Sequence, residues 1–431
     1  MKKFSPVFSI LCIFTLLVSC AVPSARKTTA SNDSPVSPLT PSVLSSQTDS
    51  PIIEAPETTQ EVLPQPPSQA PKADRSPQEK AAKIVRVLLT DNQTSAEIKH
   101  SGRVYIYTQD LSKKYKVSAP GTLAVKSVGN GRAQVGTLRA DQPIILEPAK
   151  GTLFTWNNNT YAGKIFIIPA THTFYMIEYV DLENYLYGVL PYEMSYSWPL
   201  EALKAQAVAA RTYTLKTIEN VKNKRFDLYS DVRSQMYKGG GKQYDSVKQA
   251  VDATRGQILT YDNQIFHTYY HANCGGGTDD IRAWNPTATV IKPLSGASCT
   301  TDSHSKSYSW QMNVSTAKVM DYAKTVGLKG NLKGLSIARK TSTGRATNLT
   351  IRTSSGIKQV PCGKFRLATG IRSCKITKIS IHAQTVHFEG KGYGHGIGMC
   401  QDGAHGMSKT GKDYKQILKH YYPGSKITEI K

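Results

Sequence analysis

The feature that most constrains the fold is a change of hydrophobic period near residue 190. From Ile84 to about Tyr187, short alternating apolar runs such as RVYIYT and KIFIIP are separated by turn signals such as GNGR and NNNT, which is typical of strands. From Leu200 to about Asn220, the chain is rich in Ala, Leu, Lys and Gln, and Ser197 and Pro199 precede this segment as helix start signals. Strands followed by a long helix predict an α+β fold, not alternating βαβ units.

The second half of the chain mixes both patterns. A helix is expected from Tyr244 to Gly256 and a short one from Tyr414 to Tyr421, and strands are expected within QILTYDNQIFHTYYHA, Asn348–Ile351 and Ile376–Phe388. We therefore expect a strand-rich mixed domain with one central helix and a glycine-rich loop near the C terminus, preceded by a disordered tether.

The N-terminal segment has the pattern of an export signal. Lys2 and Lys3 precede the mostly apolar run Val7–Val18, which is shorter than the roughly 20 residues that a spanning helix needs. The ending LVSC resembles a bacterial lipobox, which implies cleavage before Cys20 and lipidation of its thiol. Ordinary signal cleavage with an incidental Cys20 is the alternative. The sequence thus predicts an exported, membrane-anchored lipoprotein that faces the periplasm or cell wall.

The residues after Cys20 are dominated by Ser, Thr and Pro, with few large apolar side chains, so a disordered tether is expected as far as about Pro77. The predicted organisation is a signal peptide (1–19), a tether (20–77), a strand-rich part (78–180) and a core region (181–431).

The charge of the chain suggests several partners. The formal net charge is +23, which would ordinarily indicate nucleic acid, but export removes most nucleic acid from consideration. Lys and Arg are scattered along the folded part and form no block, so a solvated basic surface is one interpretation. Attraction to anionic polymers of the cell envelope is the other.

One carboxylate, Glu193, stands among aromatic and thioether side chains in PYEMSYSW. Desolvation there would raise its pKa and keep it protonated near neutral pH, as a proton donor requires. Alternatively, Lys204 or Arg211 on the following helix pairs with it and lowers that pKa. Glu201 lies in the first helical turn, where the helix dipole explains a glutamate, and we interpret it as structural.

The segment Gly390–Gly424 is rich in glycine, which predicts a bent or closely approached backbone. The phosphate-binding patterns GxxxxGK[ST] and GxGxxG between a strand and a helix are absent, which argues against a nucleotide site. His395 and His405 belong to no metal-binding pattern such as HExxH, so lining a cleft is the better interpretation of both.

Five cysteines remain beyond Cys12 and Cys20, and an oxidising compartment favours disulfides between them. The odd number requires a free thiol, a metal site or an intermolecular bond. They are Cys274, Cys299, Cys362, Cys374 and Cys400.

Several of these segments together resemble the SpoIID/LytB family of cell-wall proteins. They occur in the family's order and cover most of 180–431. The segments are PYEM (191–194), WPLEALKAQAVAARTY (198–213), FRLATGIRS (365–373), GYGHGIGMCQDGAHGM (392–407) and ILKHYYPG (417–424).

The resemblance implies a mechanism in which one glutamate cleaves the MurNAc–GlcNAc bond of peptidoglycan strands that lack stem peptides, leaving 1,6-anhydro ends. Glu193 matches that glutamate. Two alternatives remain: a non-enzymatic wall-binding protein that enhances a cell-wall amidase, and a basic domain that only anchors to anionic polymers. The implied partners are glycan strands, possibly an amidase, and a membrane through the lipid.

By the same resemblance, a set of side chains would line or support a glycan groove, although packing alone could explain Gln206 and Tyr213. This set is Lys204, Gln206, Arg211, Tyr213, His395 and Gln401.

The resemblance implies no required cofactor, but some members carry zinc at a cluster of Cys and His. His267, His271, Cys274 and Cys299 could supply such ligands, although we expect a Cys274–Cys299 disulfide instead. Cys400 departs from the family pattern, and it is either free or paired with Cys362 or Cys374.

Overall fold

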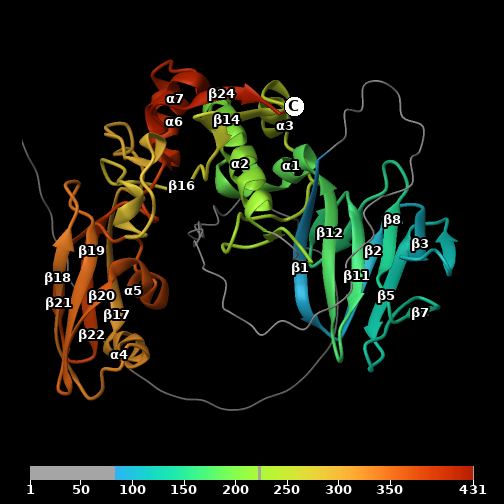
Figure 1. Cartoon of the computed structure of the whole chain (residues 1–431), viewed down its shortest axis with the longest axis horizontal. Coiled ribbons are helices and arrows are strands. Elements are labelled where there is room, and N and C mark those ends of the chain that lie inside the picture. The colour runs from blue at the N-terminus through green and yellow to red at the C-terminus, as the bar shows by residue number, and fades with distance from the viewer. Residues whose placement is uncertain (1–82, 222–224, 431) are drawn as a thin grey trace, which may run out of the picture. The chain divides into compact units, whose positions relative to one another are not determined.

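Strands dominate the first part of the computed structural model, which describes residues 83–221 and 225–430 (Figure 1). The expected export signal, Cys20 and the whole of the expected tether (20–77) lie outside the described residues. The strands of this part are β1 (Ile84–Gln93), β2 (Ser95–His100), β3 (Val104–Thr108), β4 (Lys114–Val117), β5 (Gly121–Ser127), β6 (Ala133–Val135), β7 (Leu138–Ala140), β8 (Ile144–Pro148), β9 (Phe154–Trp156), β10 (Asn159–Tyr161), β11 (Lys164–Pro169) and β12 (Phe174–Asp181).

All twelve strands pair antiparallel with their neighbours in two sheets, and β1 also pairs parallel with β13 (Leu228–Tyr229). The strand order is β13-β1-β12-β11-β8-β3-β4 in one sheet and β10-β9-β2-β5-β6-β7 in the other. Side chains alternate between buried and exposed positions along strands such as β3, as the period of two predicts. Residues of both sheets contribute to one hydrophobic core, which the helices α1 (Leu182–Glu193) and α2 (Leu200–Asn220) share.

Two consecutive helices follow the strands. Helix α2 (Leu200–Asn220) has the predicted bounds. Helix α1 (Leu182–Glu193) was not predicted, and the expectation of strands as far as Tyr187 is wrong because the strands end at Asp181. Gly188 and Pro191 disfavour a helix locally, but Asp181 caps α1 by accepting hydrogen bonds from the next residues, and most of the helix is buried in the core.

The remaining elements confirm a mixed α+β class (Figure 1). The predicted helices near 244–256 and 414–421 are present. The elements of this region are α3 (Asp245–Ala253), β14 (Gln257–Tyr261), β15 (Gln264–Ile265), β16 (Tyr270–His271), the 3-10 helices η1 (Ile281–Ala283) and η2 (Lys292–Leu294), β23 (Met399–Cys400), α6 (Gln401–Lys409), α7 (Tyr414–Tyr421) and β24 (Lys426–Glu429).

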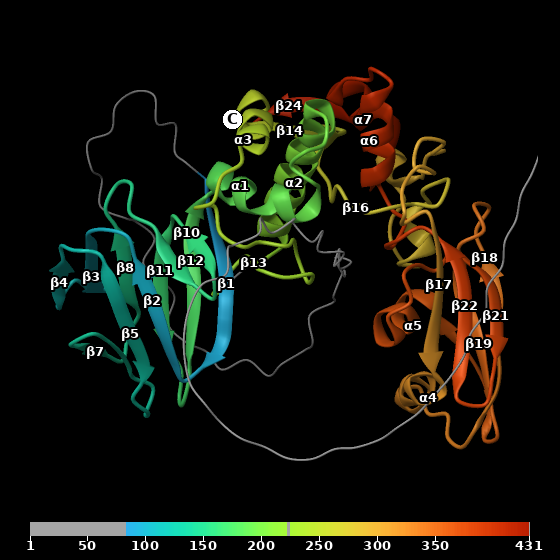
Figure 2. The same ribbon diagram turned by 180° about the vertical axis from the view of Figure 1, so that it is seen from behind.

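A second hydrophobic core forms between residues 309 and 391, where two three-stranded sheets carry two helices (Figure 2). A disulfide between Cys362 and Cys374 lies in this core. The elements are β17 (Ser309–Ser315), α4 (Thr316–Thr325), β18 (Leu332–Lys340), β19 (Ala346–Thr353), β20 (Gly356–Pro361), α5 (Cys362–Thr369), β21 (Ile376–Ile381) and β22 (Thr385–Lys391).

The glycine loop bends as its composition predicts. Gly396 and Gly398 have φ values of 84° and 68°, which L side chains rarely adopt. A Cβ atom on Gly396 would lie 2.2 Å from the guanidinium carbon of Arg345, and one on Gly398 would lie 2.0 Å from the carbonyl oxygen of Tyr269. Close packing on both sides therefore requires glycine here. Among the described residues, no helix is long and apolar enough to cross a membrane.

Candidate active site

The carboxyl group of Glu193 lies at the end of α1, where the chain leaves the helix. Its Oε1 accepts a hydrogen bond of 3.0 Å from the backbone N–H of Met236, which lies in an irregular segment after β13. This segment passes closely over α1, since a Cβ atom on Gly188 would lie 2.6 Å from the backbone of Gly239. Glu193 is 8% exposed, so it is almost enclosed but still meets solvent.

The environment of Glu193 favours its neutral form. Burial raises the pKa of this carboxyl group to about 7, although the hydrogen bonds from Met236 and from the side chain of Gln401 act in the opposite direction. The negative end of the α1 dipole adds to the cost of a charge on its last residue. The predicted protonated acid is therefore supported, and the alternative of an ion pair with Lys204 or Arg211 is not.

Gln401, at the start of α6, links this acid to Gln206 on α2. The side-chain amide of Gln401 hydrogen-bonds Glu193, and its Nε2 lies 3.5 Å from Oε1 of Gln206. Both glutamines are buried, and Nε2 of Gln206 has no hydrogen-bond partner among the described residues. Since α2 and α6 are far apart in the sequence, folding alone builds this polar contact.

The aromatic side chains nearest Glu193 differ from those that flank it in the sequence. Its charge contributes to raising the pKa of the buried Tyr185 and Tyr270 and of the partly buried Tyr213, although desolvation is the larger cause in each. The pKa of Tyr213 rises to about 12. Sequence reasoning missed Tyr185 and Tyr270, because α1 and the strand β16 bring them here.

The side chains after Glu193 form part of a half-exposed surface, the aromatic rim, which comprises Tyr192, Tyr196, Trp198 and Tyr244. Tyr196 stacks on Tyr244 with ring centres 4.1 Å apart, and Trp198 stacks on His405 at 4.4 Å. Two cations complete the rim: Lys238 lies over the ring of Tyr192, and Lys242 lies over that of Tyr244. Flat faces next to cations suit a polar ring with anionic substituents.

Two of the predicted groove residues have partners inside the protein. Arg211 is fully buried and forms a bidentate ion pair with Glu183, with N–O distances of 2.9 and 2.7 Å. It therefore does not line an open groove, because the helix face that carries it packs on α1. Lys204 pairs with Glu201 at 2.7 Å, and Glu201 also accepts from the backbone N–H of Tyr414, which supports the structural role expected for Glu201.

His395 and His405 are both buried, at 7% and 9% exposed, but they lie in different surroundings. His395 is buried between Trp284 and His271, its Nε2 bonds the carbonyl oxygen of Tyr270 at 2.9 Å, and burial lowers its pKa well below the usual range. It therefore supports β16 as a neutral group. His405 lies beside Trp198 at the aromatic rim.

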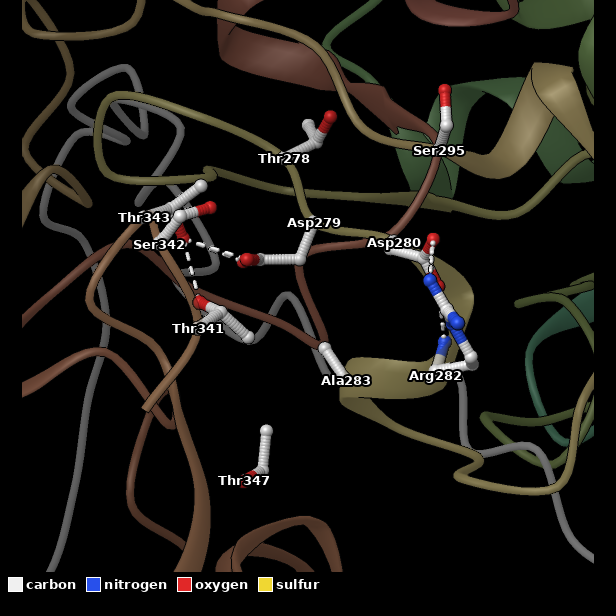
Figure 3. Close-up of a pocket in the computed structure, with 10 residues that line it drawn as sticks. All are labelled: Thr278, Asp279, Asp280, Arg282, Ala283, Ser295, Thr341, Ser342, Thr343 and Thr347. Atoms are coloured by element: carbon white, nitrogen blue, oxygen red, sulfur yellow. Dashed lines mark hydrogen bonds and ion pairs between the residues drawn. The ribbon is translucent and has the colours of Figure 1, made fainter. Parts of the chain in front are cut away.

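A separate pocket of about 290 Å³ lies between residues 278–295 and 341–347 (Figure 3). Hydroxyl groups line it, and Asp279 accepts hydrogen bonds from Thr343 at 2.7 and 2.8 Å. Asp279 also pairs with the buried guanidinium of Arg345 at 2.7 Å, so its charge is compensated. Glu193 is not among the residues that line this pocket.

The structure corrects the expected cysteine pairing. Cys274, Cys299 and Cys400 are free and buried, so the predicted Cys274–Cys299 disulfide is wrong, and so is a bond from Cys400 to Cys362 or Cys374. The three thiols instead lie together beside the carboxylate of Asp302.

The two histidines of the alternative zinc ligand set, His267 and His271, lie outside this group in the described part of the chain. Nε2 of His267 bonds the side chain of Asn220 at 3.0 Å, and Nδ1 of His271 bonds the carbonyl oxygen of Ile397 at 3.1 Å. Asp302 was missed because no local motif connects it to the cysteines.

Comparisons with known proteins agree with the motifs. A family model described as SpoIID, Stage II sporulation protein, matches residues 170–261, which include Glu193 and α2. An uncharacterised protein of Brachyspira hyodysenteriae is 34% identical over 356 residues, covering 80% of this chain and 93% of the relative.

Two relatives from Bacillus subtilis have descriptive names. Stage II sporulation protein D is 30% identical over 59% of this chain and 76% of its own length. The amidase enhancer is 29% identical over 56% of this chain, and the aligned region spans only 40% of that relative. Because the family model matches this region and Stage II sporulation protein D is similar over three quarters of its own length, the chain belongs to the SpoIID/LytB family.

Proposed function

We propose that this protein is a lytic transglycosylase that cleaves MurNAc–GlcNAc bonds in peptidoglycan strands without stem peptides. The observation that carries the proposal is the almost enclosed carboxyl group of Glu193, whose pKa is raised to about 7 by burial. With a pKa of about 7, the carboxyl group of Glu193 is protonated in about half of the molecules at neutral pH and ionised in the others. One residue can then act first as an acid and afterwards as a base.

The reaction needs one proton relay. Protonated Glu193 donates to the glycosidic oxygen as its bond to C1 of MurNAc breaks, so the GlcNAc end leaves as an alcohol. The resulting carboxylate takes the proton from the C6 hydroxyl group, whose oxygen forms a new bond to C1 and closes the 1,6-anhydro ring. No water is consumed, and a second catalytic carboxylate, which glycoside hydrolases use, is not needed.

The other groups near Glu193 fit supporting roles. The side-chain amide of Gln401 and the backbone N–H of Met236 hold the carboxyl group, and they stabilise the carboxylate that forms after proton donation. The aromatic rim offers Tyr196 and Trp198 as stacking faces for sugar rings. Lys238 and Lys242 on the same rim suit the lactyl carboxylates that denuded MurNAc exposes.

The test is mass spectrometry of peptide-free glycan strands incubated with the purified full chain. Wild type should release fragments with 1,6-anhydro ends, and Glu193→Gln should lose cleavage by roughly 100- to 10,000-fold while it retains strand binding. Glu201→Gln is the matched control, because Glu201 pairs with Lys204, and it should cleave normally. Reducing-ended fragments would mean hydrolysis by water and would contradict the proposal, as would full activity of Glu193→Gln.

A second candidate function is supported by the relative that is named an amidase enhancer. In this function the protein binds denuded strands and stimulates an N-acetylmuramoyl-L-alanine amidase without cutting glycans. Stimulation of a purified amidase that survives Glu193→Gln, without any anhydro product from wild type, would favour it over the first.

We also propose that the chain is exported and anchored through a lipid on Cys20, as the LVSC ending implies. The relatives' names, which refer to sporulation and to an amidase, agree with action outside the cytoplasm. Membrane fractionation should find wild type with the membrane and Cys20→Ala released from it.

A further inference from the structure

Four potential metal ligands meet in the interior from three separate segments of the chain. Cys274 follows β16, Cys299 and Asp302 lie after η2, and Cys400 ends β23. One ligand atom from each lies within 4.8 Å of every other, and all four residues are buried. Cys274 Sγ lies 3.1 Å from Oδ2 of Asp302, so the group is in direct contact.

The carboxylate of Asp302 is only half satisfied. Its Oδ2 also accepts a hydrogen bond of 3.0 Å from the backbone N–H of Gly276, whereas Oδ1 has no partner among the described residues. The residue is 0% exposed. A buried carboxylate oxygen without a partner is costly, and a cation between the four side chains would remove that cost.

The sulfur atoms are surrounded as metal-bound thiolates are. Cys400 Sγ accepts hydrogen bonds from the backbone N–H groups of Cys274 at 3.2 Å and Gly403 at 3.3 Å, and Cys299 Sγ lies 3.1 Å from the hydroxyl group of Tyr421. Such outer contacts orient ligands and stabilise their charge. A Cβ atom on Gly403 would lie 2.6 Å from Cys299 Sγ, so glycine is needed to bring α6 this close.

We propose that Cys274, Cys299, Cys400 and Asp302 bind one Zn²⁺ ion in a closed tetrahedral site. Zinc takes thiolate and carboxylate ligands at about 2.3 and 2.1 Å, which places neighbouring ligand atoms about 3.5 to 3.8 Å apart. The four ligand atoms lie within 4.8 Å of one another, so shifts of about 1 Å or less would bring them to these distances. Binding replaces three thiol protons, which leave to solvent, and no oxidation or reduction takes place.

This ligand set contains no histidine, unlike the alternative considered from the sequence. A metal ion bound here would also affect the candidate active site. Cys400 is the N-cap of α6, and the next residue is Gln401, which hydrogen-bonds Glu193. The zinc ion would therefore fix the start of α6 to the loops at 273–276 and 299–302. The proposal rests on the ligand geometry alone and does not depend on the proposed reaction.

The test uses the full chain, exported by the host and purified without chelator or added metal. Elemental analysis should find about one zinc per chain. Peptide mapping after alkylation, without reductant, should find Cys274, Cys299 and Cys400 protected in the native protein and modified after a chelator and denaturant are added. Removing the zinc should also lower the melting temperature.

The variant Asp302→Asn keeps the shape of the side chain and should lower zinc affinity at least about tenfold in competition with a chromophoric chelator. Asp321→Asn on α4 is the control, because Asp321 is exposed and pairs with Lys324. Cys299→Ser should lose zinc, and an intact Cys362–Cys374 bond with an unchanged circular dichroism spectrum confirms that it folds. A disulfide between any two of the three clustered cysteines in the purified protein, no bound metal, or full zinc retention by both variants would overturn the proposal.

Discussion

The backbone N–H of Met236 donates a hydrogen bond of 3.0 Å to Oε1 of Glu193, and thereby ties the segment after β13 to the end of α1. This hydrogen bond and the one from the amide of Gln401 both lower the pKa of Glu193, yet burial still raises it to about 7. Desolvation is thus the larger effect at this carboxyl group. The chemistry that we propose depends on that balance.

The pH dependence of strand cleavage should report the protonation of Glu193. Because the free enzyme must hold this proton, kcat/KM should be nearly constant below about pH 7 and fall about tenfold per unit above it. Initial rates of anhydro-end formation from pH 5 to 9, with melting curves to confirm folding, measure this. A rate that continues to rise beyond pH 8 would contradict a role as the acid.

Glu178 on β12 should make the fold less stable as pH rises. It is fully buried, accepts hydrogen bonds from Tyr237 and Gly163, and burial raises its pKa to about 7, above the ordinary 4.5. The unfolded chain releases this proton first, so stability is greatest below pH 4.5 and falls as pH rises to about 7.

Glu178→Gln should therefore lose less stability than wild type between pH 5 and 8, since one of the two buried glutamates with a raised pKa is removed. Urea unfolding midpoints at the two pH values measure it. Glu97→Gln on β2, where the side chain is exposed, is the control and should leave the fall unchanged. Equal falls for wild type and Glu178→Gln would show that Glu178 is not the source.

The ion pair between Arg211 and Glu183 should matter for stability and not for glycan binding. Arg211→Met leaves a buried carboxylate without its partner, so the free energy of unfolding should drop by about 3–5 kcal/mol. Adding Glu183→Gln should recover part of the loss, and strand affinity per folded molecule should stay at the wild-type value. If Arg211→Met lost strand affinity without a lower free energy of unfolding, Arg211 would have to bind the glycan directly, which would contradict this prediction.

The aromatic rim should contribute to strand affinity. Tyr196→Ala removes a ring that stacks on Tyr244 and is 45% exposed, and binding should weaken roughly three- to tenfold. Tyr105→Ala on β3 is the control, since Tyr105 is similarly exposed at 40% but lies in the strand-rich part. Sedimentation with denuded strands at high salt separates stacking from charge attraction. If Tyr196→Ala and Tyr105→Ala bound denuded strands equally well, the aromatic rim would not be part of the glycan-binding surface.

The sequence by itself determined the class of the fold, the bounds of α2 and α7 and the bent glycine loop, and it singled out Glu193 as the candidate acid. These depend on local period, on glycine conformation and on long motifs, all of which are readable within one segment. It failed at α1, because Gly188 and Pro191 disfavour a helix that burial and the Asp181 cap nevertheless stabilise.

Only the tertiary structure decided which side chains meet. It placed Gln401 between Glu193 and Gln206, paired Arg211 with Glu183, and brought Tyr185 and Tyr270 near the acid. It also replaced an expected disulfide with three thiols and Asp302. Burial and contacts between distant segments set these outcomes, and no local pattern of residues encodes either of them.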